Sequence, residues 1–322
     1  MALVISEDAE VGALRERAQI RLLPDGRRLY LHDGPIDLIV EAFGAPAEIN
    51  AAYGAASGRF VTVLDELCGE LSLLRQPARG GAPPAAGVIA RRMMAAVAPY
   101  CERTFITPMA AVAGAVAQEI LSTMTSAAKL SRAYVNNGGD IALHLAPGEH
   151  FAVGMVDRPD RPSLFATAVL DSMQPVRGIA TSGWRGRSFS LGIADAVTIL
   201  ADGAAQADAA ATVIANAVDL PDHPNVSRAP ARSLAPDSDL GDRLVTQAVG
   251  ELSPCEIAGA LDAGAAVAQS LLSSGLIRAA ALRLCRSTRI IGAGNAASNI
   301  PALAVETQLA ASLAPERMPN RF

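Results

Sequence analysis

The chain has 322 residues, of which 51% are hydrophobic and 18% charged, so it can bury a substantial core and global disorder is excluded. Its formal net charge of -5 disfavours a nucleic-acid partner, which would require a basic face. The apolar residues are mostly alanine and short aliphatics, with only 4% aromatics, which favours closely packed helices beside a sheet.

The sequence also bears on the compartment. It contains no run of about eighteen uncharged apolar residues, so neither a transmembrane helix nor a membrane partner is expected. Residues 1–17 carry acids where a signal peptide would need a basic region, which predicts a cytoplasmic protein. Four scattered cysteines, without a CxxC pair, are predicted to be buried as small hydrophobes: Cys68, Cys101, Cys255 and Cys285.

The first hundred residues predict a hairpin followed by helices. Residues 19–40 form two alternating runs around the turn signal of residues 24–26. Residues 45–74 carry apolar side chains at helical spacing, and residues 88–102 predict a second helix. Residues 76–87 are rich in proline and glycine and are expected to form a loop between them.

A third helix is predicted to begin at Thr107 and Pro108, because a hydroxyl N-cap followed by proline is typical of a helix start. The helix continues towards Thr123 through residues 109–117, nearly all of them small. Such small side chains allow a close backbone approach to a neighbouring helix or to a ligand. The packing interpretation is favoured.

Strands are predicted next. Residues 129–145 indicate two strands joined by a tight turn at residues 136–140. The turn has two interpretations: it is only a hairpin, or its glycine amides reach a ligand while Asp140 binds a hydroxyl. Residues 151–156 and 166–170 predict two further strands, with a turn at residues 157–162 between them.

The central stretch, residues 178–218, combines three features. A small-residue turn is expected at residues 181–183, and residues 194–200 form an apolar run. An alanine-rich helix follows, in which Asp208 and Thr212 are four residues apart and therefore share one face. A carboxylate and a hydroxyl on one face suit a hard cation, but an ordinary alanine-rich core helix explains the same spacing.

The C-terminal third predicts a long polar loop at residues 221–242 and a helix that begins at Ser253. Glu256 stands three residues after Ser253, which is the pattern of a capping box. Residues 279–284 predict the last strand, and residues 286–322 are expected to form a C-terminal tail.

Several other sites are disfavoured. Residues 289–297 contain a GxGxxA pattern, but the chain ends too soon to complete a dinucleotide-binding unit. No histidine stands at a spacing from Ser182 that indicates a catalytic base, so a serine hydrolase is disfavoured. Histidine and cysteine do not cluster as zinc ligands would. Oxygen-based metal chemistry remains, with Asn216 one further turn along the face of Asp208 and Thr212.

Several segments together, in order and spacing, resemble the ApbE-like superfamily, whose best-known members are magnesium-dependent FAD:protein FMN transferases. The segments that carry the resemblance are VNNGGDI (135–141), IATSG (179–183), VTIL (197–200) and ADAAAT (207–212). The resemblance implies an α+β fold related to the tunnelling fold, with a mixed or antiparallel sheet packed with helices. We expect a single domain over residues 1–322, with a core motif region at residues 105–218.

The resemblance also implies site residues. In the flavin transferases the aspartate and threonine of the DAxAT-like segment bind magnesium, which assigns that role here to Asp208 and Thr212. The GGD and TSG segments contact FAD in the family, which implies this role for six residues: Gly138, Gly139, Asp140, Thr181, Ser182 and Gly183. Magnesium would neutralise the diphosphate and assist transfer of the FMN phosphoryl group to a hydroxyl, or cleavage of the FAD pyrophosphate.

One departure from the family stands out. The transferases carry a histidine-containing segment between the TSG and VTV motifs, whereas residues 184–196 contain no histidine. Asp195 is expected to take over part of the acidic role, as a catalytic residue. Two alternatives therefore stay open: a non-catalytic flavin-binding or assembly protein, and an enzyme of another cofactor pathway such as one-carbon or pterin metabolism. The expected partner is a small flavin or nucleotide ligand, and a homo-oligomer is left open.

Overall fold

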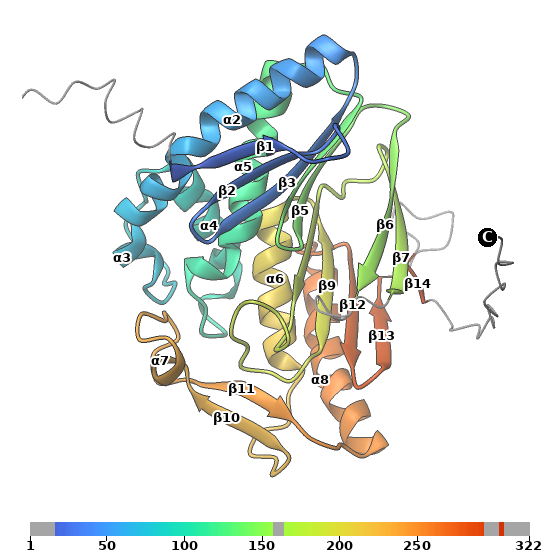
Figure 1. The fold of residues 1–322 in the computed structure, drawn as a ribbon. Helices are drawn as coiled ribbons and strands as arrows, with labels where there is room; N and C mark the ends of the chain where they lie inside the picture. Colours follow the sequence, from blue (N-terminus) through green and yellow to red (C-terminus); the bar gives the residue numbers. More distant parts are fainter. Residues whose placement is uncertain (1–16, 157–163, 293–302, 306–322) are drawn as a thin grey trace, which may run out of the picture.

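A large antiparallel sheet organises the computed structural model, which describes residues 17–156, 164–292 and 303–305 (Figure 1). Its nine strands, in spatial order, are β1 (Gln19–Leu22), β2 (Leu29–Asp33), β3 (Ile36–Phe43), β4 (Arg132–Asn137), β5 (Asp140–Leu145), β8 (Gly178–Ser182), β9 (Ala196–Ala201), β12 (Ala279–Leu284) and β13 (Ser287–Ile291). Every neighbouring pair in this sheet is antiparallel, so the antiparallel form of the predicted sheet is the observed one.

Two smaller sheets accompany it. One contains β6 (His150–Val156), β7 (Leu164–Asp171) and β14 (Leu303–Val305). The other is a ribbon of β10 (Val226–Pro230) and β11 (Leu244–Val249) at the bottom of Figure 1.

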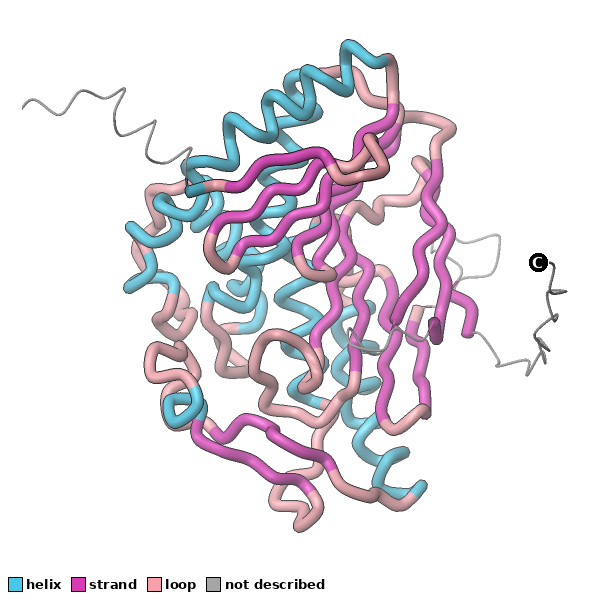
Figure 2. Tube along the Cα trace, in the orientation of Figure 1, coloured by secondary structure: helices cyan, strands magenta, loops and turns pink. Residues whose placement is uncertain are grey.

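Helices cover one face of the large sheet, as Figures 1 and 2 show. The helical elements are α2 (Pro46–Gly69), α3 (Leu71–Leu74), α4 (Val88–Val97), η1 (Ala98–Tyr100), η2 (Pro108–Ala111), α5 (Val112–Ala127), α6 (Ala204–Ala217), α7 (Ala231–Leu234) and α8 (Pro254–Ser273). Along the sheet, α2 contacts β2 and β3, α5 contacts β4 and β5, α6 contacts β8 and β9, and α8 contacts β12 and β13. The predicted α+β class is confirmed.

The alternation of side chains along the strands divides the interior into two cores. The first lies between the large sheet and the helices, and includes Leu31, Val135 and Ile199. The second lies on the opposite face, where the sheet of β6, β7 and β14 packs against β5, β8, β9 and β12 through residues such as Leu170 and Leu200. No residue of β2 or β3 belongs to the described part of this second core, so the second core does not cover the outer face of those two strands.

The small residues at the start of α5 permit a close approach of two helices. A Cβ atom at Gly114 would lie 2.3 Å from the carbonyl oxygen of Ala204, at the start of α6. Only glycine avoids that backbone collision. The packing interpretation of this segment is confirmed at Gly114.

Several local predictions are confirmed. Ser253 and Glu256 form the capping box at the start of α8, with each side chain bonded to the other residue's backbone amide. The predicted turn at Gly138 and Gly139 joins β4 to β5, and both glycines have positive φ. The helix predicted over residues 45–74 is present as α2 and α3, with a break at Glu70.

Two predictions about turns and caps are wrong. Thr181 and Ser182 belong to β8 instead of a turn, because they pair with Thr198 and Val197 of β9 inside the sheet. A central position in the sheet overrides local turn propensity. The hydroxyl of Thr107 does not cap a helix but donates a hydrogen bond to the carboxylate of Asp239, and residues 108–111 form a 3-10 helix before α5.

Two predictions about extended segments are also wrong. The expected loop over residues 221–242 contains β10 and α7, because β10 finds its partner, β11, just beyond that interval. The expected tail begins with β13, which pairs with β12 across a turn at Cys285 and Arg286. Both turn residues have positive φ, which usually requires Asn or Gly, so no local pattern marks this hairpin.

The cysteines also differ from expectation. Cys68, Cys255 and Cys285 are exposed and Cys101 is half-buried, so the predicted burial is wrong. None of the helices in the described ranges is long and apolar enough to span a bilayer. The GxGxxA segment lies mostly outside the described residues, as does the predicted turn at residues 157–162.

Candidate functional site

Two carboxylates, distant in sequence, come together between the large sheet and the helical layer. Asp140 is the first residue of β5, and Asp208 lies in the second turn of α6. The backbone amide of Thr181 donates to the carboxylate of Asp140 at 3.2 Å. The backbone amide of Gly114 donates to the carboxylate of Asp208 at 3.0 Å. The site therefore draws on a strand start, a strand end and two helices.

The two carboxylates influence each other's ionisation. Burial raises the pKa of Asp140 to about 7, although the hydrogen bond from Thr181 opposes that shift. Burial also raises the pKa of Asp208 well above its usual value, and the negative charge of Asp140 raises it further. Each residue retains a partly exposed surface, but desolvation of the carboxylate is the largest influence on both. Two like charges in a desolvated space disfavour the doubly ionised state.

The surroundings supply only partial positive charge. Among the ion pairs of the described ranges, none joins an arginine, lysine or histidine to Asp140 or Asp208. Gly114 lies in the first turn of α5, where the amide dipoles favour an anion. A pair of carboxylates with this shortage of cations is a donor set that fits a hard divalent ion.

The remaining predicted metal residues lie on α6. Thr212 is half-buried one helical turn after Asp208, on the same face of α6. Asn216 has another role, because its side-chain oxygen accepts a hydrogen bond from the amide of Leu191 at 2.9 Å. It anchors the segment between β8 and β9.

The predicted FAD-contacting segments lie next to one another. Gly138 and Gly139 form the turn directly before Asp140, and the amide of Gly139 donates to the side chain of Asn136 at 2.8 Å. The hydroxyl of Thr181 is 2.9 Å from the hydroxyl of Thr198 on β9. The two motifs, about forty residues apart in sequence, are thus joined through the Thr181 amide and Asp140.

Gly183 and Asp195 lie at the end of the β8–β9 pair that also carries Thr181. A Cβ at Gly183 would lie 2.5 Å from the carbonyl oxygen of Asp195, so this position requires glycine. The two carboxylate oxygens of Asp195 are both engaged, one by Arg185 at 2.8 Å and one by the amide of Cys285 at 2.7 Å. These contacts fix the end of the sheet. The catalytic role expected of Asp195 stays a prediction.

Sequence reasoning missed three contributors to the site. The small-residue pattern marks Gly114 only for packing, yet its amide binds Asp208. Asn137 donates from its side chain to the carbonyl of Ala113 at 3.2 Å, which ties β4 to the start of α5. Arg187 is exposed and lies over the glycine turn, with a guanidinium nitrogen 3.1 Å from where a Cβ of Gly138 would be. No local pattern marks any of these contacts.

The fold and this site define an α+β protein with a half-buried acidic pair between sheet and helices. The chain belongs to the family described as "AbpE bacteria", whose model matches residues 20–294. This membership confirms the resemblance to ApbE-like proteins.

The chain is also similar to curated archaeal proteins. It is 40% identical over 138 residues to a UPF0280 protein of Methanothermobacter thermautotrophicus, a match that covers 42% of this chain and 51% of that protein. It is 36% identical over 129 residues to a UPF0280 protein of Methanopyrus kandleri, with 40% of this chain and 48% of that protein covered. The chain thus spans about half the length of the curated relatives it matches.

Solved structures give a weaker similarity. A mutant of the flavin transferase ApbE from Vibrio cholerae aligns with a TM-score of 0.43 and 10% identity, covering 85% of this chain and 96% of that chain. The apo flavinyl transferase ApbE of Pseudomonas stutzeri aligns with a TM-score of 0.39 and 12% identity, covering 86% of this chain and 97% of that chain.

Proposed function

We propose that this protein binds Mg2+ at Asp140 and Asp208 and, beside the ion, a flavin nucleotide or a related phosphorylated ligand. The observation that carries the proposal is the half-buried, desolvated carboxylate pair, which has backbone amides but no ion-pair partner among the described residues. A divalent cation would neutralise both charges, which the amides alone do not.

The roles of individual residues follow from their positions. Asp208 and Thr212 would hold the cation from α6, and Asp140 would face it from β5. The exposed Gly138 and its neighbour Gly139 leave the turn without side chains, so a phosphate group can approach the backbone. Thr181, Ser182 and Gly183 would line the ligand on the adjacent strand.

A bound Mg2+ would supply charge neutralisation for a diphosphate and polarise a phosphoryl oxygen. On this basis the reaction class is transfer of the FMN phosphoryl group to a hydroxyl, or cleavage of the FAD pyrophosphate. Membership of the AbpE family supports this assignment.

Calorimetry tests the proposal directly. We expect Mg2+ to bind the purified protein and FAD to bind in its presence. Asp208→Ala should abolish both the Mg2+ affinity and the thermal stabilisation that Mg2+ gives. Asp237→Asn is the matched control, because Asp237 is an exposed carboxylate away from the site. Wild-type protein with neither Mg2+ nor FAD affinity would contradict the proposal, as would unchanged Mg2+ affinity in Asp208→Ala.

A second candidate is a flavin-binding or assembly protein without catalytic activity. It is favoured by the contacts of Asp195, the residue expected to take over part of the acidic role. Arg185 and the Cys285 amide already engage both of its carboxylate oxygens. This candidate predicts FAD binding without turnover. Release of AMP or FMN from FAD, detected by chromatography, would exclude it.

A further inference from the structure

A small hollow lies beside the glycine turn, on the face of the sheet opposite the helices. Its volume is about 170 Å³, and its lining residues are Tyr30, Asp37, Ile39, Asn136, Gly138 and Gly139. That volume is below the roughly 300–1,000 Å³ of pockets for whole small-molecule ligands. It suits one moiety of a larger ligand.

The hollow contains a carboxylate oxygen that needs a donor. Oδ1 of Asp37 is buried, and no hydrogen-bond partner for it exists in the described structure. Leaving such an acceptor unsatisfied destabilises the folded state, so an N–H or O–H donor from a ligand would be favourable there. His32, opposite Asp37 in the strand register, likewise has a buried Nδ1 without a partner among the described residues.

The other lining groups suit a ring or a sugar. Tyr30 offers an aromatic face, and a side-chain hydrogen bond between its hydroxyl and the Asp37 carboxylate raises the pKa of that hydroxyl. The side-chain oxygen of Asn136 is occupied by the Gly139 amide, so its NH2 group remains as a donor for a ligand acceptor. Donors and acceptors thus meet beside an apolar surface.

A cation lies next to the same turn. The guanidinium of Arg187 is exposed, lies close to Gly138, and is near enough to Tyr30 to lower the pKa of its hydroxyl against the larger effect of Asp37. An arginine in this position can bind a phosphate oxygen. The turn residue Gly139 is followed directly by Asp140, so the glycine turn connects the hollow on one face of the sheet with the acidic pair on the other.

The segment that carries Arg187 is held by the ribbon of β10 and β11. The side chain of Arg228 on β10 donates to the carbonyl of Leu191, and the hydroxyl of Thr246 on β11 donates to the carbonyl of Gly192 at 2.8 Å. Asn216 at the end of α6 accepts from the amide of Leu191. These contacts hold Leu191 and Gly192, four and five residues after Arg187, against the ribbon and the end of α6.

We infer that this hollow is a nucleoside subsite: it binds the N–H or O–H donors of a base or sugar at Asp37, while Arg187 binds the attached phosphate. The inference deepens the proposed function, on which it rests for the identity of the ligand as a phosphorylated nucleotide. It assigns binding roles to Asp37, Asn136 and Arg187, which neither the motifs nor the acidic pair include.

Calorimetry with three monophosphates tests the subsite and identifies the donor. The probes are AMP, IMP and FMN, each with and without Mg2+. IMP has a carbonyl where AMP has an amino group, so binding of AMP alone would assign the donor to the base. Equal binding of AMP and IMP would assign it to a group that the two share, such as the ribose hydroxyls, and binding of FMN alone would assign it to the ribityl chain or to the N–H of the flavin ring. Binding of none of the three would overturn the inference.

Variants supply the controls. Asp37→Asn keeps the shape but replaces an acceptor by a donor, so the affinity for the bound probe should fall at least about tenfold, as it should in Arg187→Gln. Asp237→Asn and Arg286→Gln change the same charges at exposed positions, the latter at the same end of the sheet, and should change affinity less than about twofold. Unchanged probe affinity in Asp37→Asn, with unfolding like that of the wild type, would overturn the inference.

The outcome is separable from that of the metal proposal. Affinity for Mg2+ alone should be lost in Asp208→Ala and retained in Asp37→Asn. Loss of probe binding in Asp37→Asn, together with unchanged Mg2+ affinity in Asp208→Ala, would sustain the subsite and remove the metal site. The opposite pattern would sustain the metal site and remove the subsite.

Discussion

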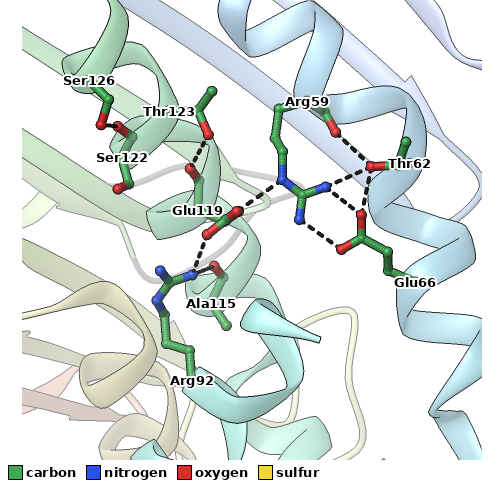
Figure 3. Close-up of polar contacts among 9 residues, drawn as sticks. All are labelled: Arg59, Thr62, Glu66, Arg92, Ala115, Glu119, Ser122, Thr123 and Ser126. Atoms are coloured by element: carbon green, nitrogen blue, oxygen red, sulfur yellow. Dashed lines mark hydrogen bonds and ion pairs between the residues drawn. The ribbon is translucent and has the colours of Figure 1, made fainter. Parts of the chain in front are cut away.

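Helix α5 contacts two groups of carboxylates that are neutralised in different ways. In its middle, Glu119 accepts hydrogen bonds from Arg59 of α2 at 2.9 Å and Arg92 of α4 at 3.0 Å, as Figure 3 shows. Arg59 also holds Glu66 through two nitrogens. At its start, α5 offers Asp208 backbone amides, those of Gly114 and Ala113, and no charged side chain is paired with it in the described part of the chain. One helix therefore contacts both a network in which the carboxylates are paired with arginines and an acidic pair whose carboxylates have no arginine partner among the described residues.

The ionisation of the two groups differs accordingly. Burial raises the pKa of Glu66, but hydrogen bonds from Arg59 and Thr62 outweigh it, so the net pKa is lowered. The pKa values of Asp140 and Asp208 are both raised. Charges in the network stabilise the fold, whereas charges in the acidic pair oppose it until a cation binds. Unfavourable pKa values of this kind are typical of functional sites.

The largest expected effect concerns the contact that brings the acidic pair together. Gly114→Ala should lower the free energy of unfolding by about 3 kcal/mol or more, because the new Cβ would lie 2.3 Å from a backbone oxygen of α6. Urea denaturation measures this effect. Gly259→Ala in α8 is the control, since nothing lies within 4 Å of its new Cβ, and it should be neutral or stabilising. Equal free energies of unfolding for Gly114→Ala and Gly259→Ala would contradict the close contact between α5 and α6.

The pH dependence of stability should follow the acidic pair. In the folded state the pKa of Asp140 is about 7 against a usual 3.8, so between these values the folded state binds more protons than the unfolded state. Stability without divalent ions should therefore fall as pH rises from about 5 to about 7, by roughly 2 kcal/mol. Denaturation in EDTA at each pH measures this. The decrease in unfolding free energy should be smaller in Asp140→Asn. An increase in unfolding free energy between these pH values would contradict the raised pKa of Asp140.

Removal of a carboxylate from the network should destabilise the fold. Glu119→Gln would leave Arg59 and Arg92, both largely buried, without their shared acceptor charge. The expected loss in unfolding free energy is about 2 kcal/mol, less than for a fully buried pair because the arginines keep some solvent contact. Glu251→Gln, at an exposed position, should change little. If Glu119→Gln unfolds with the same free energy as the wild type, the charge of Glu119 does not contribute to the stability of the fold.

The corresponding change in the acidic pair should have the opposite sign. Asp208→Asn, measured at about pH 8 without divalent ions, should raise the free energy of unfolding by about 1 kcal/mol, because it removes one of two like charges. The same variant should gain nothing from added Mg2+. Thermal or urea unfolding with and without Mg2+ checks both expectations. If Asp208→Asn is destabilised as much as Glu119→Gln, then the charge of Asp208 stabilises the fold as the charge of Glu119 does, and the proposed difference is contradicted.

Local patterns predicted much of the architecture. The apolar spacing of α2, the capping box at Ser253 and the glycine turn before Asp140 each depend on residues close in sequence. The hairpin turn at Cys285 and Arg286 was missed because its residues lack the usual conformational signature. Strand β10 was missed because its polar sequence is stabilised only by pairing with β11.

The sequence by itself determined that Asp208 and Thr212 share a face of one helix, because a helical repeat fixes residues four apart. Only the tertiary structure decided that Asp140 lies near enough to Asp208 for its charge to raise the pKa of Asp208, that the Gly114 amide binds Asp208, and that Arg187 lies over Gly138. These relations depend on strand order and on how closely α5 approaches α6. Neither is encoded in the spacing of neighbouring residues, since each arises from packing between elements far apart in the chain.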